Sequence, residues 1–221
     1  MNRSDAVRPA EYRWTSATAP HTYAYLWPKI DAILESLSPR KSPAGQNSNN
    51  RGFFDRGCGN GACMRHSLER GFCPLGVDPS TSGIEAARQA APALNVKVGS
   101  DYDSLAETYW TFPIVVSLEV VEHLYFPKQF ARNVFELLEP GGTAVICTPF
   151  HGYWKNLSMA LTGNLDKHFT VLLDHGHIKF WSPETLTILL REAGFQKVSF
   201  DYAGRFYPFS KSMIAIAEKP A

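Results

Sequence analysis

Phe53-Phe54-Asp55-Arg56-Gly57-Cys58-Gly59-Asn60-Gly61 is the stretch that decides the fold, because an apolar run breaks there into three glycines within five residues. A helix-like run over 62–68 follows, so the order predicts a strand, a tight loop and a helix. Glycines suit a loop that a ligand approaches closely or that needs a positive φ. The N–H groups at the start of the helix can donate to a polar or anionic group. Asp78 ends the next apolar run, where its carboxylate could accept hydrogen bonds from a ribose diol. The stretch therefore predicts a nucleoside-cofactor site.

Length and composition indicate an ordinary globular chain. Its 221 residues suit one α/β domain with decorations, and 44% hydrophobic content with 19% charged residues is typical of that class. A net charge of +1 gives no general attraction to nucleic acid, so nucleic acid is not expected as a partner. No apolar run reaches the roughly 20 residues of a membrane span. The four cysteines form no Cys-x-x-Cys pair, and the polar start of the sequence is not expected to act as a secretory signal, so we expect a reduced, cytoplasmic setting.

The chain divides by composition into two parts. Residues 1–50 indicate a polar arm, a helix over 21–37 and a flexible connector over 38–50, rich in Pro, Ser, Gly and Asn. We expect the catalytic domain to occupy 51–221, with an insertion at about 150–181 that acts as a lid. The aromatic residues of the first helix either cap the core or wall the active site.

Strands and helices alternate through the second part. Strands are expected at 53–56, 74–77, 96–99, 113–118, 143–147, 198–202 and 212–217, with helices at 62–68, 81–91, 127–138 and 183–193. Ser182 and Pro183 are expected to begin the last helix and Gly194 to end it, and the last two strands could pair as a hairpin. This alternation predicts a doubly wound, Rossmann-like α/β fold with a mostly parallel seven-stranded sheet and helices on both faces. Ligands bind such sheets at the carboxyl ends of the strands.

The glycine loop alone leaves the cofactor open. Gly57-x-Gly59-x-x-Ala62 also satisfies the dinucleotide fingerprint, and Asp78 lies 19 residues past Gly59. The loop and Asp78 therefore fit either a nicotinamide dehydrogenase or a methyltransferase.

Five motifs in order decide between them. The chain resembles the class I S-adenosylmethionine-dependent methyltransferases, and is similar to the ubiquinone-pathway O-methyltransferases and other small-molecule methyltransferases, over about residues 51–148. The motifs are Asp55-x-Gly57-x-Gly59-x-Gly61, Val77-Asp78-Pro79, Gly99-Ser100-Asp101, Ser117-Leu118-Glu119-Val120-Val121-Glu122-His123-Leu124 and Leu138-Glu139-Pro140-Gly141-Gly142.

The resemblance implies roles for these residues. Asp55 and the glycine-loop backbone would hold the methionine moiety, Asp78 the ribose, and Asp101 the adenine amino group. It also implies an antiparallel last strand and an acceptor site over the fourth and fifth strands. The implied cofactor contacts are Asp55, Gly57, Cys58, Gly59, Asn60, Gly61, Asp78, Pro79, Ser80, Ser100, Asp101, Leu118, Glu119 and Val120. For Asp101 and Glu119, a surface or helix-start carboxylate remains the alternative.

Arg56 departs from the family pattern, which usually has an aliphatic residue there. Because a buried unpaired guanidinium is very costly, we expect Arg56 to pair with a carboxylate or to reach water along its aliphatic stem.

The aromatic, His-rich segment 150–181 is the expected acceptor side, with a short helix at 157–161. Its Phe, Tyr and Trp content suits a small apolar or aromatic acceptor. We expect the methylated atom to be oxygen rather than carbon or nitrogen. A hydroxyl acceptor needs a general base. His123 and His177 are the first candidates, with His151 in reserve.

The same region offers an alternative metal site. Glu119, Glu122 and His123 would share one face if their segment were helical, and could join His177. This set resembles the Glu-x-x-Glu-His pattern of small-RNA 2′-O-methyltransferases, where it binds a divalent ion, and that of the ubiquinone-pathway enzymes. Neutral composition and the missing basic tract argue against RNA, so the metal-free interpretation is favoured. A non-catalytic nucleoside-binding protein and a nicotinamide dehydrogenase remain the alternative functions.

Overall fold

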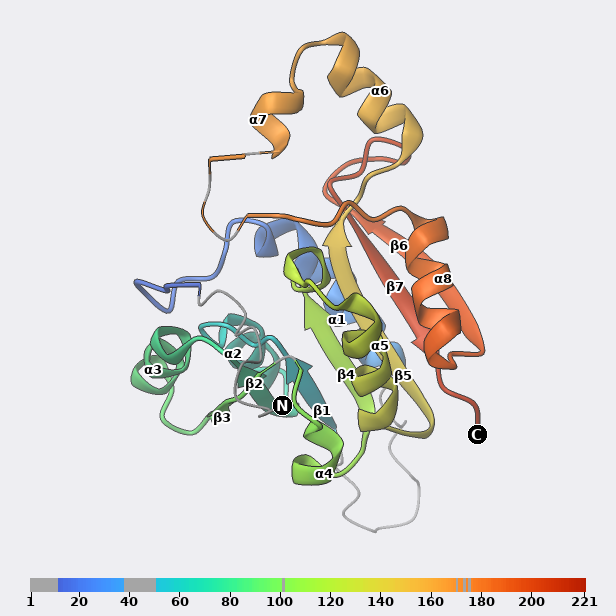
Figure 1. Ribbon diagram of the computed structural model, residues 1–221. Helices are drawn as coiled ribbons and strands as arrows, with labels where there is room; N and C mark the ends of the chain where they lie inside the picture. The colour runs from blue at the N-terminus through green and yellow to red at the C-terminus, as the bar shows by residue number, and fades with distance from the viewer. Residues whose placement is uncertain (1–11, 38–50, 101, 170, 173, 175) are drawn as a thin grey trace, which may run out of the picture.

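The computed structural model describes residues 12–37, 51–100, 102–169, 171–172, 174 and 176–221 (Figure 1). Its centre is a seven-stranded sheet in the order β3-β2-β1-β4-β5-β7-β6, in which β7 runs opposite to the other six strands. This confirms the predicted fold class and the terminal hairpin. The strands are β1 Gly52–Arg56, β2 Cys73–Asp78, β3 Asn95–Val98, β4 Phe112–Leu118, β5 Leu138–Pro149, β6 Lys197–Ala203 and β7 Ser212–Glu218.

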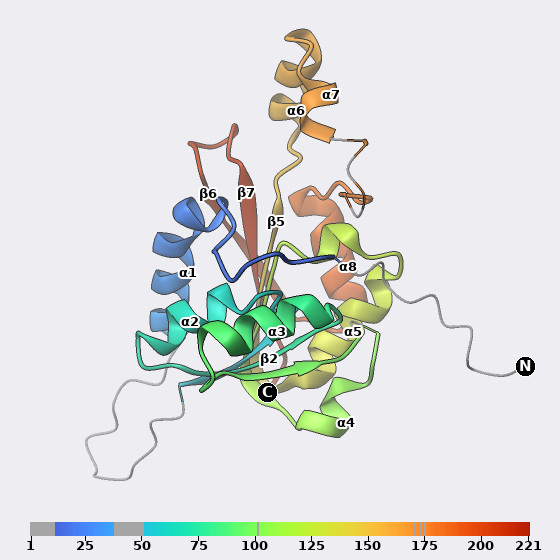
Figure 2. The same cartoon turned by 90° about the vertical axis from the view of Figure 1, so that its left-hand side faces the viewer.

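Helices cover both faces of the sheet (Figure 2). One face carries α1 Tyr23–Leu37, α2 Ala62–Leu68 and α3 Thr81–Ala90, and the other carries α4 Leu105–Tyr109, α5 Pro127–Leu137 and α8 Pro183–Ala193. Val115 and Val116 of β4 are fully buried, one against each layer. A strand covered on both faces needs a continuous apolar run, which explains why this segment shows no alternation.

The strand order reverses between β1 and β4, which lie side by side although β2 and β3 separate them in sequence. At such a point the connections that leave the carboxyl ends of the two strands turn to opposite sides of the sheet, which leaves a crevice between them. The loops after β1, β2 and β4 therefore meet at one rim, above which the segment from β5 to α8 projects (Figure 1).

Sequence signals place α8 well. Ser182 is its N-cap, forms a reciprocal capping box with Thr185, and Pro183 begins the helix. Gly194 ends it in the left-handed conformation with φ 111°. The helix therefore has the bounds that its local residues dictate.

Other elements differ from the prediction. Strand β5 begins at Leu138 and not at residue 143, because residues 139–142, whose Pro and Gly content favours a turn, lie inside it at a register shift between the pairs Phe112–Leu138 and Ile114–Thr143. The insertion holds two helices, α6 Tyr153–Leu161 and α7 Leu165–Phe169, where only part of the first was expected. The connector 38–50 lies outside the described residues. No described helix is long and apolar enough to cross a membrane.

Candidate functional site

A cavity of about 700 Å³ opens at the carboxyl ends of β1, β2 and β4. It joins the expected cofactor loop to two of the expected catalytic histidines. The predicted site residues that line it are Gly57, Cys58, Gly59, Asn60, Asp78, Pro79, Leu118, Glu119, Val120, His123 and His177.

The glycine loop is held in shape by Asp78. The Gly59 N–H donates to Asp78 Oδ2 and the Ser80 N–H donates to Oδ1, each over 2.8 Å. Gly59 has φ 53° and Gly57 has φ 81°, a region that favours glycine. A carboxylate oxygen accepts more than one hydrogen bond, so Asp78 can hold the loop and a ribose diol together.

Asp55 lies behind the loop and is 1% exposed. Burial, followed by the nearby Asp78 charge, raises the pKa of Asp55 to about 7, while a hydrogen bond with Cys63 opposes the shift. Among the described residues its buried Oδ2 has no hydrogen-bond partner. A buried acceptor without a donor is costly, so this atom fits the ammonium group of a methionine moiety.

Besides Asp55, three described residues among the predicted cofactor contacts do not line the cavity: Gly61, Ser80 and Ser100. Gly61 packs between α2 and α3, where a methyl group would lie 2.8 Å from Ala87 Cβ. Ser80 is the N-cap of α3 and accepts from the Gly83 N–H. The Ser100 N–H donates to Asp103 Oδ2 over 2.7 Å, and Asp101 lies outside the described residues.

Arg56 does not reach water, so that part of the expectation is wrong. Its side chain is fully buried, and its guanidinium lies 4.8 Å from the centre of the Phe130 ring. The ring face offers partial negative charge to a desolvated cation. The Phe130 ring of α5 thus offsets part of the free-energy cost of burying the Arg56 charge at the end of β1.

The expected helix through Glu119 is shorter than the spacing suggested. Only Val121–His123 is helical, as a single 3₁₀ turn, and Glu119 precedes it with φ 58°. The Glu119 carboxylate accepts from Cys147 Sγ over 3.2 Å and from Ser212 Oγ over 3.4 Å. Glu119 therefore does not join Glu122 and His123 on one face, and the four-residue metal set is reduced to three.

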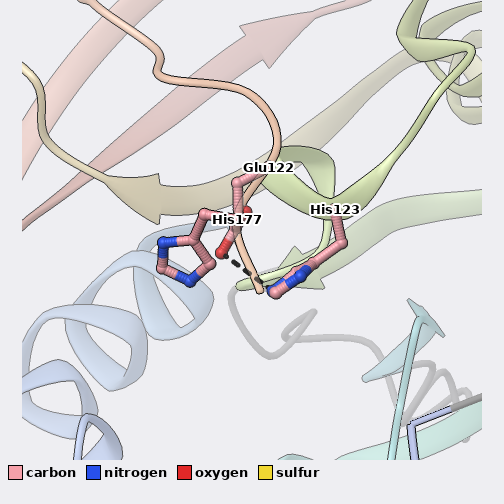
Figure 3. A group of neighbouring side chains, drawn as sticks. All are labelled: Glu122, His123 and His177. Atoms are coloured by element: carbon pink, nitrogen blue, oxygen red, sulfur yellow. Dashed lines mark ion pairs between the residues drawn. The ribbon is translucent and has the colours of Figure 1, made fainter. Parts of the chain in front are cut away.

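Glu122, His123 and His177 form a compact cluster at the cavity (Figure 3). Each offers one ligand atom, and these atoms lie within 4.8 Å of one another. Glu122 Oε1 is 3.8 Å from His123 Nε2, and the two imidazole rings meet edge to face with centroids 4.9 Å apart. His123 Nδ1 lies 3.2 Å from the Gly176 carbonyl oxygen, which can only accept, so Nδ1 carries a proton.

The pKa shifts of Glu122 and His177 bear on whether this cluster can bind a proton or a cation. Burial and the Glu119 charge raise the pKa of Glu122. Burial, then His123 and His168, lower the pKa of His177 to about 4. A neutral imidazole can accept a proton or bind a metal, and one carboxylate with two imidazoles is a known donor set for divalent transition metals.

His151 lies apart from this cluster. It is 7% exposed, does not line the cavity, and packs against His168 and Phe180 at centroid distances of 5.2 and 5.0 Å. Burial, followed by Lys155 and His168, lowers the pKa of His151 to about 4. His151 thus does not share the cavity that His123 and His177 line.

Two segments line the cavity that sequence reasoning had not assigned to it residue by residue. From the N-terminal side come Tyr12, Trp14, Pro20, Thr22 and Tyr23, and from the insertion come Phe169, Val171, Asp174, Gly176, Ile178 and Phe180. In both segments, the aromatic residues were the feature of the sequence that could have indicated a place at the cavity. The sequence predicts only a polar arm before the first helix, whereas the structure ties it to the glycine loop: the Asn60 side chain donates to the carbonyls of Ser16 and Thr18 over 2.9 and 2.8 Å.

Comparison with known proteins gives consistent matches. A family model described as "Methyltransferase domain" matches residues 25–199. The ubiquinone biosynthesis O-methyltransferase of Ruegeria pomeroyi is 31% identical over 152 residues, which cover 66% of this chain and 60% of that protein. The chain thus spans about 60% of the length of this curated relative.

Solved structures agree on the fold. The methyltransferase domain of bacterial CtHen1 matches with a TM-score of 0.63 at 20% identity, covering 86% of this chain and 96% of that one. A SAM-dependent methyltransferase from Archaeoglobus fulgidus matches with a TM-score of 0.60 at 16% identity, covering 87% and 94%. The family match begins inside α1, so residues 12–22 lie outside it.

Proposed function

Because the chain belongs to the class I S-adenosylmethionine-dependent methyltransferases, we propose that it methylates a hydroxyl oxygen of a small molecule. One observation carries the proposal: a single cavity joins the glycine loop and Asp78 to His123 and His177. The cofactor loop and the groups able to take a proton thus face the same space. The family also excludes the nicotinamide dehydrogenase that the glycine loop alone allowed.

On the cofactor side, S-adenosylmethionine supplies an electrophilic methyl group, and the protein supplies alignment. Asp78 would hold the ribose and Asp55 the ammonium. Leu118 and Val120 line the cavity beside Glu119, where the methionine chain would lie.

On the acceptor side, His177 and His123 would take the hydroxyl proton. Burial lowers the pKa of His177, so its imidazole is neutral at physiological pH, and the Gly176 carbonyl accepts from His123 Nδ1 and so orients that ring. The same three side chains could hold a divalent cation, which would lower the pKa of a hydroxyl group bound to it. Buried Glu122 Oε1 lacks a hydrogen-bond partner among the described residues, which is compatible with that alternative.

The insertion favours an aromatic or apolar acceptor. We propose that residues 150–181 act as a lid, because Phe169, Ile178 and Phe180 line the same cavity as the glycine loop. Apolar walls with a few convergent polar groups are typical of small-molecule sites. The name of the Ruegeria relative supports oxygen as the methylated atom.

The test is methyl transfer to a panel of phenols, catechols and aliphatic alcohols, with S-adenosylmethionine as donor and mass detection of the methylated product. We expect turnover on hydroxylated aromatic acceptors. His123→Ala and His177→Ala should each lower kcat by about 10²-fold or more, while the Kd for S-adenosylhomocysteine changes less than about threefold. His66→Gln is the matched control, since His66 stacks on Trp27 and contacts Asp31 instead of lining the cavity.

Two further experiments separate this proposal from a metal-dependent mechanism and from a protein that binds the nucleoside without catalysis. Loss of turnover in EDTA, restored by Mg²⁺ or Mn²⁺, would replace the metal-free base with the metal site. Cofactor binding without any product across the panel would instead favour the non-catalytic nucleoside-binding protein. Full turnover by both histidine variants would overturn the assignment of the base.

A further inference from the structure

We infer that the arm, residues 12–22, forms one wall of the cofactor site, with Trp14 as a binding residue for the nucleoside cofactor. This inference rests on the proposed function, because it takes the same cavity as the cofactor site. The arm precedes the residues that the family model matches, so the wall is a feature of this chain beyond the matched domain.

The arm is fixed to the elements that build the cofactor loop. The Trp14 N–H donates to Ser82 Oγ over 3.0 Å, and Ser80 Oγ donates to the Tyr12 carbonyl over 2.6 Å. Arg65 of α2 donates to the Ala17 carbonyl as well as to the Asn60 carbonyl. Most of these bonds join side chains of the domain to the arm backbone, so they fix its path rather than its sequence.

The Trp14 indole rests directly on the glycine loop. A methyl group added at Gly59 would lie 2.6 Å from Trp14 Cζ2, and one added at Gly83 would lie 2.8 Å from Trp14 Cδ1. Both glycines therefore leave room for the ring. Tyr12 meets Trp14 edge to face with centroids 5.0 Å apart, which makes a small aromatic surface.

That surface shares the cavity with the groups expected to hold the nucleoside. Tyr12 and Trp14 line it together with Gly59, Asp78 and Pro79. A ligand whose ribose binds Asp78 must therefore lie against the arm. Contact with an aromatic wall removes apolar area from water and stabilises a bound ligand that presents a flat base or a ribose face. Cofactor binding and arm docking should thus stabilise each other.

Calorimetric titration with S-adenosylhomocysteine tests the inference. Trp14→Ala should weaken binding about tenfold, and Trp14→Phe should weaken it less, because part of the aromatic contact remains. Ser82→Ala should weaken binding about two- to fivefold, since Ser82 accepts from the Trp14 N–H without lining the cavity itself. Trp110→Ala is the matched control, because its indole is 80% exposed and does not line the cavity. Circular dichroism and urea midpoints check that each variant folds.

Limited proteolysis gives a second readout in the wild-type chain. Arg13 is exposed within the arm, so trypsin should cleave after it, and saturating S-adenosylhomocysteine should slow that cleavage several-fold. Wild-type affinity in folded Trp14→Ala, with no protection at Arg13, would overturn the inference and leave the proposed function intact. Failure of the wild type to bind S-adenosylhomocysteine would overturn the proposed function first.

Discussion

Burial of the Asp55 carboxyl has a consequence for the stability of the protein. Its pKa is raised to about 7 in the folded chain from an ordinary 3.8, so the native state holds this proton more tightly than the unfolded state. Protonated Asp55 therefore contributes to the free energy of unfolding. This contribution is fully present below pH ~4 and is lost as the pH rises from ~4 to ~7. Above that range, ionised Asp55 destabilises the protein without ligand.

We therefore predict that Asp55→Asn raises the free energy of unfolding of the ligand-free protein at pH 8 by about 1–3 kcal/mol, and changes it little at pH 4. Urea unfolding at the two pH values measures this. The same variant should bind S-adenosylhomocysteine at least about tenfold more weakly, because a charge-assisted hydrogen bond is lost. Destabilisation at pH 8 would contradict this account of Asp55.

His177 carries a second residue-scale prediction. With its pKa lowered to about 4, it should stay neutral between pH 5 and 8 and charge only in more acidic solution. Nuclear magnetic resonance titration of the imidazole signals, with His177→Gln to assign the peak, should show a midpoint near 4. A midpoint of 6 or above would contradict the buried environment that lowers the pKa of His177.

The position of a residue at the cavity could be predicted from sequence where the residue lies at or just after the end of a strand, as for Asp78 and His123. Side-chain contacts could not be predicted where tertiary packing decides them. The positive φ of Glu119 turns its carboxylate toward Cys147 and Ser212, and no spacing rule anticipates that choice. The Phe130 ring beside Arg56 likewise comes from an element distant in sequence.

At the scale of elements, α8 shows what local signals contribute to stability. Removing its reciprocal cap with Ser182→Ala should cost about 1 kcal/mol, measured as a lower urea midpoint. Ser104→Ala is the matched control, because Ser104 occupies the N-cap of α4 without a side-chain cap bond. Equal losses in the two variants would show that the capping box contributes nothing specific.

Long periodic elements were predictable because burial of one face imposes a repeat on the sequence. Short ones were not: α4 and α7 have five residues each, too few to establish a period. The early start of β5 was hidden by Pro140 and the two glycines after it, which read locally as a turn. Pairing of Leu138 with Phe112 overrides that local signal.

At the scale of the whole molecule, ligand binding should raise stability by mass action. S-adenosylhomocysteine at about 100 times its Kd should contribute about 2.7 kcal/mol, and raise Tm by about 5–10 °C in a chain of this size. NAD at the same concentration should leave Tm unchanged. Thermal shift assays with both ligands measure this, and stabilisation by NAD alone would be incompatible with the family assignment.

The insertion leaves the body of the protein and returns to it at nearly the same point. The His151 N–H donates to the Trp181 carbonyl over 3.1 Å, which joins its entry to its exit, and the Phe150 N–H donates to the Lys211 carbonyl over 2.9 Å. A segment closed at its base can change length and composition without moving the strands that carry it. The chain therefore offers a natural graft site, where segments between 152 and 180 could be exchanged to redirect acceptor choice while the cofactor half of the sheet stays untouched.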